Sequence, residues 1–173
     1  MLLINIDKKR YRKHLNIIIV GFIVGLLILA LTFGQLLILS FSQEGVSNFR
    51  YNLLGVVLSL LVCAVILHTL KKSVFFIEIY YVWQVKQIQN LIYRKLKKIK
   101  AAAENTDPNI EKNALIILSF YYQSLQQVYQ LDDNTLTIAK VNKDLSTLQE
   151  TISNKNLNIS AEQFDKKLLS SYS

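Results

Sequence analysis

Two long apolar stretches constrain the fold of this chain more than any other feature. Between residues 15 and 70 only Glu44 and Arg50 are charged, and they separate an apolar run at 15–41 from a second at 51–70. As a helix the first run would be about 40 Å long, against a bilayer core of roughly 30 Å. We therefore predict two transmembrane helices, at 15–41 and 51–70, joined by a loop at 42–50.

A cleaved signal peptide is the competing interpretation of the first run, because basic residues precede it. The apolar core of a signal peptide is roughly 7–15 residues long and is followed by small residues at the cleavage site. The run at 15–41 is much longer, and no such cleavage pattern follows it. We expect it to remain in the protein as an anchor.

Basic residues flank the two apolar runs at the ends that face away from the loop. Residues 1–14 contain five basic residues and one acid, and Lys71 and Lys72 directly follow the second run. Such flanks stay in the cytoplasm under the positive-inside rule. The sequence therefore predicts a basic cytoplasmic N-terminus at 1–14, an external loop at 42–50 and a cytoplasmic C-terminal part.

Small residues recur at a spacing of four in both predicted spans. Gly21 and Gly25 lie in the first, and Gly55, Ser59 and Cys63 lie in the second. Small residues at this spacing allow helix backbones to approach closely in lipid. Two interpretations remain open: a face for dimerisation, or packing of the two spans on each other as a hairpin.

Residues 71–104 are predicted to form an amphipathic juxtamembrane helix. Apolar residues recur at spacings of three or four from Val74 to Ala103. No Gly or Pro occurs in 56–107, which favours a second span that continues into this helix without a break. The helix ends in a basic run of Arg94, Lys95, Lys97, Lys98 and Lys100.

This basic run has three interpretations. If the helix lies on the membrane, the run meets anionic lipids, and each basic residue near the surface contributes roughly 1 kcal/mol. If the helix projects from the membrane, the run meets nucleic acid, an acidic partner or acids on later helices. A solvated helix face is the third interpretation. Nucleic acid is disfavoured as a partner, because the basic excess of the chain lies beside the spans rather than on a folded domain.

Residues 105–173 are predicted to form a cytoplasmic helical domain of about three helices. Asp107-Pro108 is typical of a helix start. The cluster at 132–134 predicts a turn, after which Thr135 or Thr137 would cap the next helix. Ser160 and Gln163 form a capping-box pattern that predicts a last short helix. The predicted fold is thus an all-α membrane protein with a two-span hairpin, a juxtamembrane helix and a cytoplasmic helical domain.

No pattern in the sequence points to catalysis, a cofactor or a metal. His14 and His68 would lie at the same membrane face, but two histidines without a nearby cysteine or carboxylate cluster make a poor metal site. Asp132 and Asp133 are more typical of a turn than of an acid–base pair. All five glycines lie in or beside the spans, so no phosphate-binding loop is present. An enzyme is the class with the least support.

The chain resembles an uncharacterised family of small bacterial two-pass inner-membrane proteins, classed as a domain of unknown function. The resemblance covers nearly the whole chain, and it implies a bacterial inner-membrane location but no activity, cofactor or catalytic residue. It rests on the segments IDKKRYRKHLN (6–16), YVW (81–83) with KQ (86–87), IYRKL (92–96), FYYQ (120–123) and LDDNTL (131–136).

Tyrosines and glutamines are unusually frequent on the predicted helix at 109–130 and include Tyr121, Tyr122 and Tyr129. Tyrosine is favoured at interfaces because it buries a large area and keeps a polar group. We therefore expect a membrane-anchored interaction protein whose cytoplasmic helices bind a protein partner or a second copy of the chain. The alternative is an accessory subunit of a transport or channel complex that acts through its spans.

Overall fold

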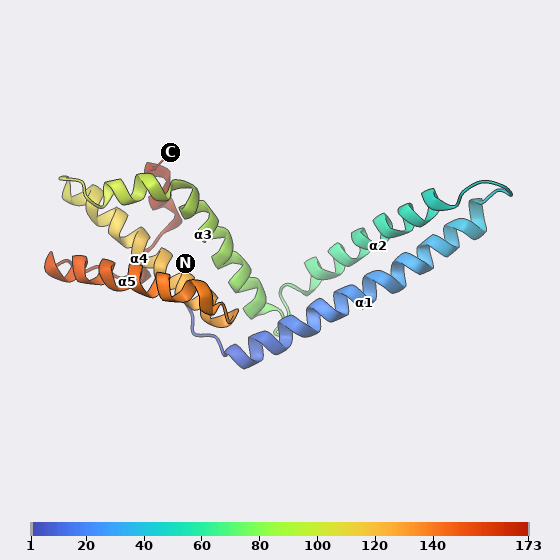
Figure 1. Ribbon diagram of the computed structural model, residues 1–173, viewed down its shortest axis with the longest axis horizontal. Coiled ribbons are helices and arrows are strands. Elements are labelled where there is room, and N and C mark those ends of the chain that lie inside the picture. Colours follow the sequence, from blue (N-terminus) through green and yellow to red (C-terminus); the bar gives the residue numbers. More distant parts are fainter. Residues whose placement is uncertain (1, 173) are drawn as a thin grey trace. The chain divides into compact units, whose positions relative to one another are not determined.

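The computed structural model describes residues 2–172, and all regular secondary structure within that range is helical (Figure 1). The chain divides into two compact units. One is a helical hairpin, Lys9–Tyr80, and the other is a helical domain built from the N-terminal segment (residues 2–8) and residues 81–172. The elements are α1 (Lys8–Phe41), α2 (Phe49–Leu70), α3 (Ile77–Ala102), α4 (Pro108–Leu131), α5 (Thr135–Asn154), η1 (Ala161–Gln163) and η2 (Lys166–Ser171).

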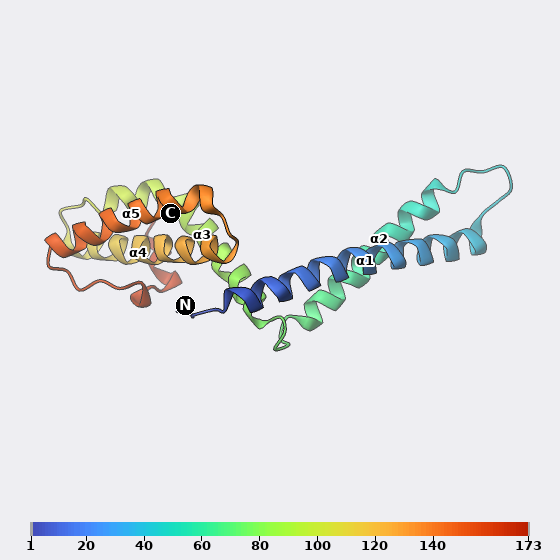
Figure 2. The ribbon, with the colours of Figure 1, turned by 60° about the horizontal axis from the view of Figure 1, so that its bottom comes forward.

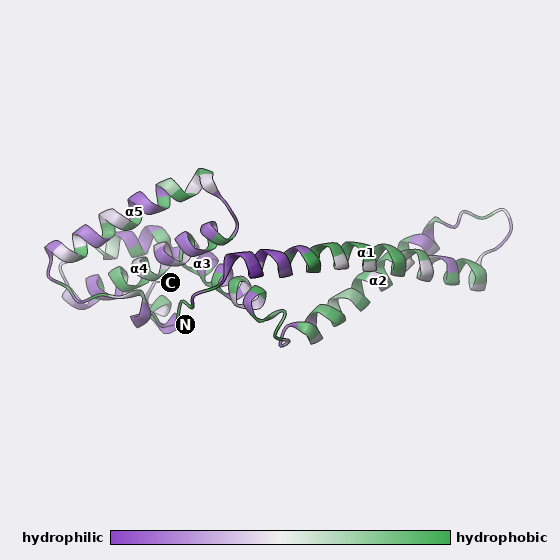
Figure 3. Cartoon of the chain, turned by 90° about the horizontal axis from the view of Figure 1, so that it is seen from below, coloured by the Kyte–Doolittle hydropathy of each residue, from purple (hydrophilic) through white to green (hydrophobic). Residues whose placement is uncertain are grey.

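The hairpin is apolar on nearly all sides of both helices. Figure 3 shows hydrophobic residues along most of α1 and α2, whereas hydrophilic and hydrophobic residues alternate along α3 to α5. In the most apolar window of α1 only 6% of the residues are buried, and in that of α2 only 17%. Both helices are long and apolar enough to cross a membrane, as length and composition show. The all-helical fold with two such helices is therefore confirmed.

The helical domain is organised around α4, which packs against α5, η1 and η2 (Figure 2). Every residue from Ala114 to Tyr122 is buried, so α4 is covered on all sides near its middle. The ring of Phe120 stacks on that of Phe164, with centroids 4.1 Å apart. Side chains from α3, including Ile92 and Ile99, complete the same core.

The N-terminal segment packs against the domain, although more than 70 residues separate it from the rest of that unit. Ile6 is buried, and the backbone N–H of Ile4 donates to the Tyr81 hydroxyl over 3.0 Å. The side-chain amide of Gln127 donates to the carbonyl of Ile4 over 2.5 Å, and Lys8 forms an ion pair with Asp133. Residues 2–8 are thus attached to the domain by hydrogen bonds between the Ile4 backbone and two side chains, by one ion pair and by the buried side chain of Ile6.

The expected continuous helix from the second span into residues 71–104 is interrupted. Helix α2 ends at Leu70, residues 71–76 form turns, and α3 begins at Ile77. Within this turn the N–H of Ser73 bonds to the Leu70 carbonyl and that of Phe76 to the Ser73 carbonyl. The turn brings Phe75 onto the ring of His14 in α1, with centroids 4.0 Å apart. Helix α2 thus ends at a turn whose aromatic ring stacks on α1, although no helix-breaking residue is present.

The helix ends in the domain follow local sequence signals with two corrections. The Asp107 side chain caps α4 and Pro108 is its first residue, as predicted. The cap of α5 is Asn134, whose side chain accepts the N–H of Thr137, rather than Thr135 or Thr137. The predicted capping box of Ser160 and Gln163 is present, but it caps a three-residue 3-10 turn and no α-helix follows.

Candidate functional site

Small residues determine how closely the two hairpin helices approach. A Cβ on Gly55 would lie 2.5 Å from the backbone nitrogen of Gly34 and 2.8 Å from its Cα, so the backbones are in contact at this point. Ser59 and Cys63 follow at the same spacing and are also buried. Gly34 is the counterpart of Gly55 on α1, although it is not among the predicted packing residues, and the carbonyl of Ala30, one turn earlier, would also lie 2.9 Å from a Cβ on Gly55.

Gly21 and Gly25 lie where the two helices have moved apart. A Cβ on either glycine would meet no heavy atom within 4 Å. Within the chain, therefore, packing of the hairpin involves Gly55, Ser59 and Cys63 but not Gly21 and Gly25. The pair on α1 borders open space instead.

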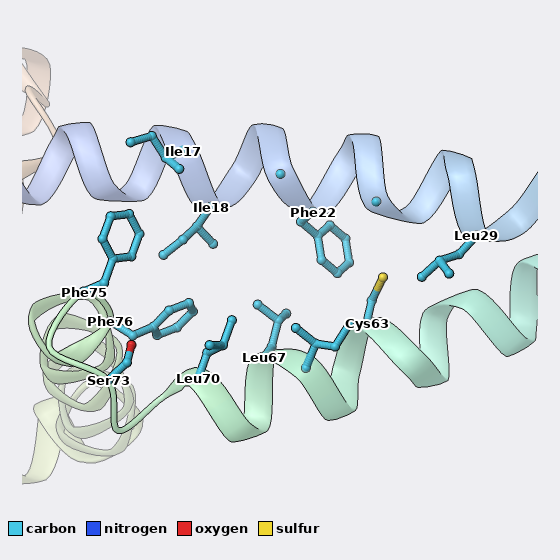
Figure 4. A pocket seen from close by; sticks show the side chains of 13 residues that line it. Ile17, Ile18, Phe22, Leu29, Cys63, Leu67, Leu70, Ser73, Phe75 and Phe76 are labelled. Carbon is cyan, nitrogen blue, oxygen red and sulfur yellow. The ribbon is translucent and has the colours of Figure 1, made fainter.

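That open space is a cavity of about 520 Å³ between α1 and α2, which we call the wedge (Figure 4). Figure 4 shows side chains from both helices and from the 71–76 turn around it. Gly21 and Gly25 contribute bare backbone to one wall. The larger lining side chains include Ile18, Phe22 and Leu29 of α1, Cys63 and Leu67 of α2, and Phe75 of the turn.

Polar and charged side chains gather at the end of the hairpin that carries the turn. Arg10 forms an ion pair with Glu78, and the Lys71 amine lies 3.2 Å from Nε2 of His68. His14 stacks on Phe75, and its Nδ1 is buried without a hydrogen-bond partner. The two histidines thus have separate neighbours, a lysine and an aromatic ring.

The basic run of α3 is partly used by the domain itself. The Lys95 amine donates to the carbonyl of Leu169 over 2.9 Å. Lys100 lies 5.8 Å from the centroid of the Tyr122 ring, and hydrogen bonding to the Tyr122 hydroxyl raises the pKa of Lys100. Arg94, Lys97, Lys98 and Lys100 are exposed, and Lys95 is half-buried. Four of the five basic residues predicted from the sequence therefore lie on the surface of the domain, while Lys95 bonds within it.

Two of the three tyrosines expected at a partner interface lie in the core of the domain. Tyr121 and Tyr122 are only 6% and 7% exposed, so their rings have little surface to offer a partner. Burial, and then the neighbouring Tyr122, Tyr129 and Tyr93, raise the pKa of Tyr121 to about 12. Tyr129 is half-buried and Tyr93, which was not predicted, is exposed. Both line a groove of about 470 Å³ together with Gln89.

The acidic pair after α4 is engaged in ion pairs. Asp132 bonds to the Lys86 amine over 2.7 Å, and Asp133 pairs with Lys8. Asp133 has a positive φ of 54°, which is typical of a turn. Across residues 2–172 no group of three or more His, Cys, Asp or Glu side chains is placed to hold a metal ion.

These features define an all-helical protein with two helices long and apolar enough to cross a membrane and a separate packed helical domain. The sequence profile of a family described as "Protein of unknown function (DUF3087)" matches residues 1–169, so the chain belongs to that family. Searches of curated proteins and of solved structures gave no match.

Proposed function

We propose that this protein is a membrane-anchored interaction protein of the bacterial cytoplasmic membrane. Helices α1 and α2 cross the bilayer as a hairpin, with the 42–48 loop outside and both termini in the cytoplasm. The helical domain binds a protein partner or a second copy of the chain. No catalytic step is part of this proposal.

The exposed apolar surface of the hairpin is the observation that carries the membrane anchor in this proposal. Large apolar side chains such as Leu31 and Leu39 on α1 are 74% and 75% exposed, and Leu61 on α2 is 60% exposed. The core helix of a soluble protein would bury most of these side chains, because soluble proteins rarely expose apolar patches larger than a few hundred Å². A bilayer is the solvent that suits helices apolar on every side.

The two chain segments that form the helical domain support the proposed orientation, in which both termini lie on one side of the membrane. Its parts come from residues before the hairpin and residues after it, and hydrogen bonds join the two parts. Chain segments that fold together must lie on the same side of a membrane, so an even number of crossings separates them. The basic flanks place that side in the cytoplasm by the positive-inside rule.

Insertion and orientation are tested with single cysteines in a Cys63→Ala background. Glu44→Cys reports on the loop and Lys166→Cys on the domain, and both positions are exposed. Intact cells are treated with a thiol reagent that does not cross membranes. We expect labelling at position 44 alone. Labelling at position 166 would contradict the proposed topology. Extraction of the protein from the membrane by alkaline carbonate would contradict the anchor itself.

Site-specific photocrosslinking in the full-length protein distinguishes the adaptor from the accessory subunit. A photoreactive amino acid is placed in the domain groove at Tyr93 or Tyr129, or on the hairpin at Leu31 or Leu61. We expect a discrete protein adduct from the groove positions, because Tyr93 is 66% exposed beside a formed cavity. Adducts from the hairpin positions alone would support the accessory subunit of a transport or channel complex.

A further inference from the structure

We infer that the wedge between α1 and α2 is a binding site for one acyl chain of an anionic phospholipid. This inference rests on the membrane insertion proposed above, and it adds a specific lipid ligand to a protein that is otherwise only anchored. The wedge is lined almost entirely by apolar groups, and Gly21 and Gly25 leave part of its wall without side chains.

The dimensions of the wedge suit an acyl chain. Its lining runs along α1 from Ile17 to Leu29, which is about 18 Å at the helical rise. One leaflet of a bilayer core is about 15 Å thick, half of the full core. The cavity volume of about 520 Å³ lies within the range of pockets that hold one small ligand, roughly 300–1,000 Å³.

A second copy of the chain fits the wedge less well. A helix about 10 Å across would occupy roughly 1,400 Å³ over the same length. The wedge also narrows to backbone contact at Gly34 and Gly55, which leaves no room for a helix at that end. An acyl chain, by contrast, tapers to a methyl group and has no polar atoms to satisfy inside the cavity.

Charge at the wide end of the wedge selects the headgroup. Lys13 lies one helical turn before Ile17 and therefore on the same face of α1, and Lys71 directly follows Leu70 of the lining. Within Lys9–Tyr80 the flanks of the hairpin carry six basic residues against one acid, Glu78, which is already paired with Arg10. A phosphodiester headgroup with no ammonium group to balance its negative charge complements this surface better than a zwitterion does.

The test uses tryptophan quenching by lipids with brominated acyl chains, in vesicles of phosphatidylethanolamine with a minor share of brominated phosphatidylglycerol. Full-length protein carries Trp83→Phe to remove the native fluorophore. Phe22→Trp then reports on the wedge, and Leu31→Trp, at a position 74% exposed, reports on bulk lipid. We expect half-quenching at position 22 at a lower phosphatidylglycerol fraction than at position 31, by about fivefold for each basic residue that contacts the headgroup.

Three variants locate the effect. Gly25→Leu fills the wedge and should reduce quenching at position 22 to the bulk level, whereas Val65→Leu, at an exposed position outside the wedge, should not. The double variant Lys13→Gln with Lys71→Gln should remove the preference of position 22 for phosphatidylglycerol. In vesicles in which phosphatidylethanolamine carries the bromine instead, the same variant should still be quenched at position 22.

The outcomes separate this inference from the proposed function. Equal quenching at both positions, absence of quenching at position 22 alone, or quenching at position 22 that depends on the protein-to-lipid ratio overturns the lipid site. The last result would indicate a second copy in the wedge. Absence of quenching at position 31 as well means that the hairpin is not in the bilayer, and then the proposed function itself fails.

Discussion

At Gly55 a hydrogen atom is the largest side chain that the hairpin accepts. A Cβ there would clash with backbone atoms of Gly34, which cannot move without moving α1. We expect Gly55→Ala to destabilise the hairpin by about 1–3 kcal/mol, as overpacking does elsewhere. Thermal unfolding in detergent, followed by circular dichroism, measures this. Gly21→Ala is the control, because its Cβ meets open space and should leave stability unchanged or slightly higher. Equal losses in both variants would contradict the close contact.

The phenol of Tyr121 links the stability of the domain to alkaline pH. Its pKa is 10.0 in an unperturbed chain and about 12 in the folded protein, chiefly through burial. The folded state therefore holds the proton more tightly than the unfolded state does. This contribution to stability is complete below pH 10 and is lost as the pH rises towards about 12. Between pH 10 and about pH 12 we therefore expect the free energy of unfolding to fall less in Tyr121→Phe than in the parent protein. Urea unfolding followed by Trp83 fluorescence measures this. Identical pH dependence in the two proteins would exclude Tyr121 as the cause.

Burial of individual tyrosines could not be predicted from the sequence. Residues 114–122 contain only one strongly polar side chain, Ser119, so the periodicity that separates a buried face from an exposed face is absent. The structure resolves the ambiguity by covering α4 on all sides, which buries Tyr121 and Tyr122. Tyr93, by contrast, follows the buried Ile92 and faces solvent. Whether a tyrosine of these helices is buried or exposed therefore depends on how α3 and α5 pack around α4, which the sequence does not reveal.

The start of α4 provides a test at the level of a whole element. The Asp107 carboxylate accepts the N–H of Asn109 over 2.8 Å and that of Ile110 over 3.4 Å. We expect Asp107→Ala to cost about 1 kcal/mol, since two backbone donors lose their partner. For a domain of this size that corresponds to roughly 4–8 °C in the melting temperature. Asp107→Asn keeps the acceptor and should stay near the parent. A silent Asp107→Ala would mean that the first turn of α4 frays without consequence.

Element boundaries were predictable where the signal is local and not where packing overrides it. Asp107-Pro108 and the turn after Leu131 are marked by residues that cap helices or adopt turns on their own. The break at 71–76 has no such residue, and the contact found there, between Phe75 and His14, joins the turn to a different helix. The tail after Ser160 likewise adopts extended backbone at Phe164, because that ring stacks on Phe120 rather than continuing a helix.

For the whole molecule, hydropathy was sufficient to predict the hairpin but not the wedge. Two charge-free runs of membrane length are visible in the sequence itself. The wedge depends on where α1 and α2 touch, at Gly34 and Gly55, and on how far they diverge from there. Residues 2–7 carry no periodic pattern, so their packing on a domain that starts at residue 81 was not predictable either.

The last prediction concerns the N-terminal segment, residues 2–8, whose contacts join it to residues far along the chain such as Tyr81 and Gln127. Ile6 is 8% exposed against the domain, so Ile6→Ala should lower the stability of the domain by about 2 kcal/mol or more. Trp83 is the only tryptophan and lies in the domain, so its fluorescence during urea unfolding in detergent reports on that unit. Leu2→Ala is the matched control, since its side chain is 60% exposed.

A silent Ile6→Ala would show that the segment does not pack on the domain in the membrane-bound protein. The structural basis for placing both ends of the chain on one side would then be lost, and the basic flanks alone would support that orientation. If Ile6→Ala lowers the stability of the domain and Leu2→Ala does not, the N-terminal segment must pack on residues 81–172 in the membrane-bound protein. Any topology with an odd number of crossings between residues 8 and 81 is incompatible with that result, whatever the domain binds.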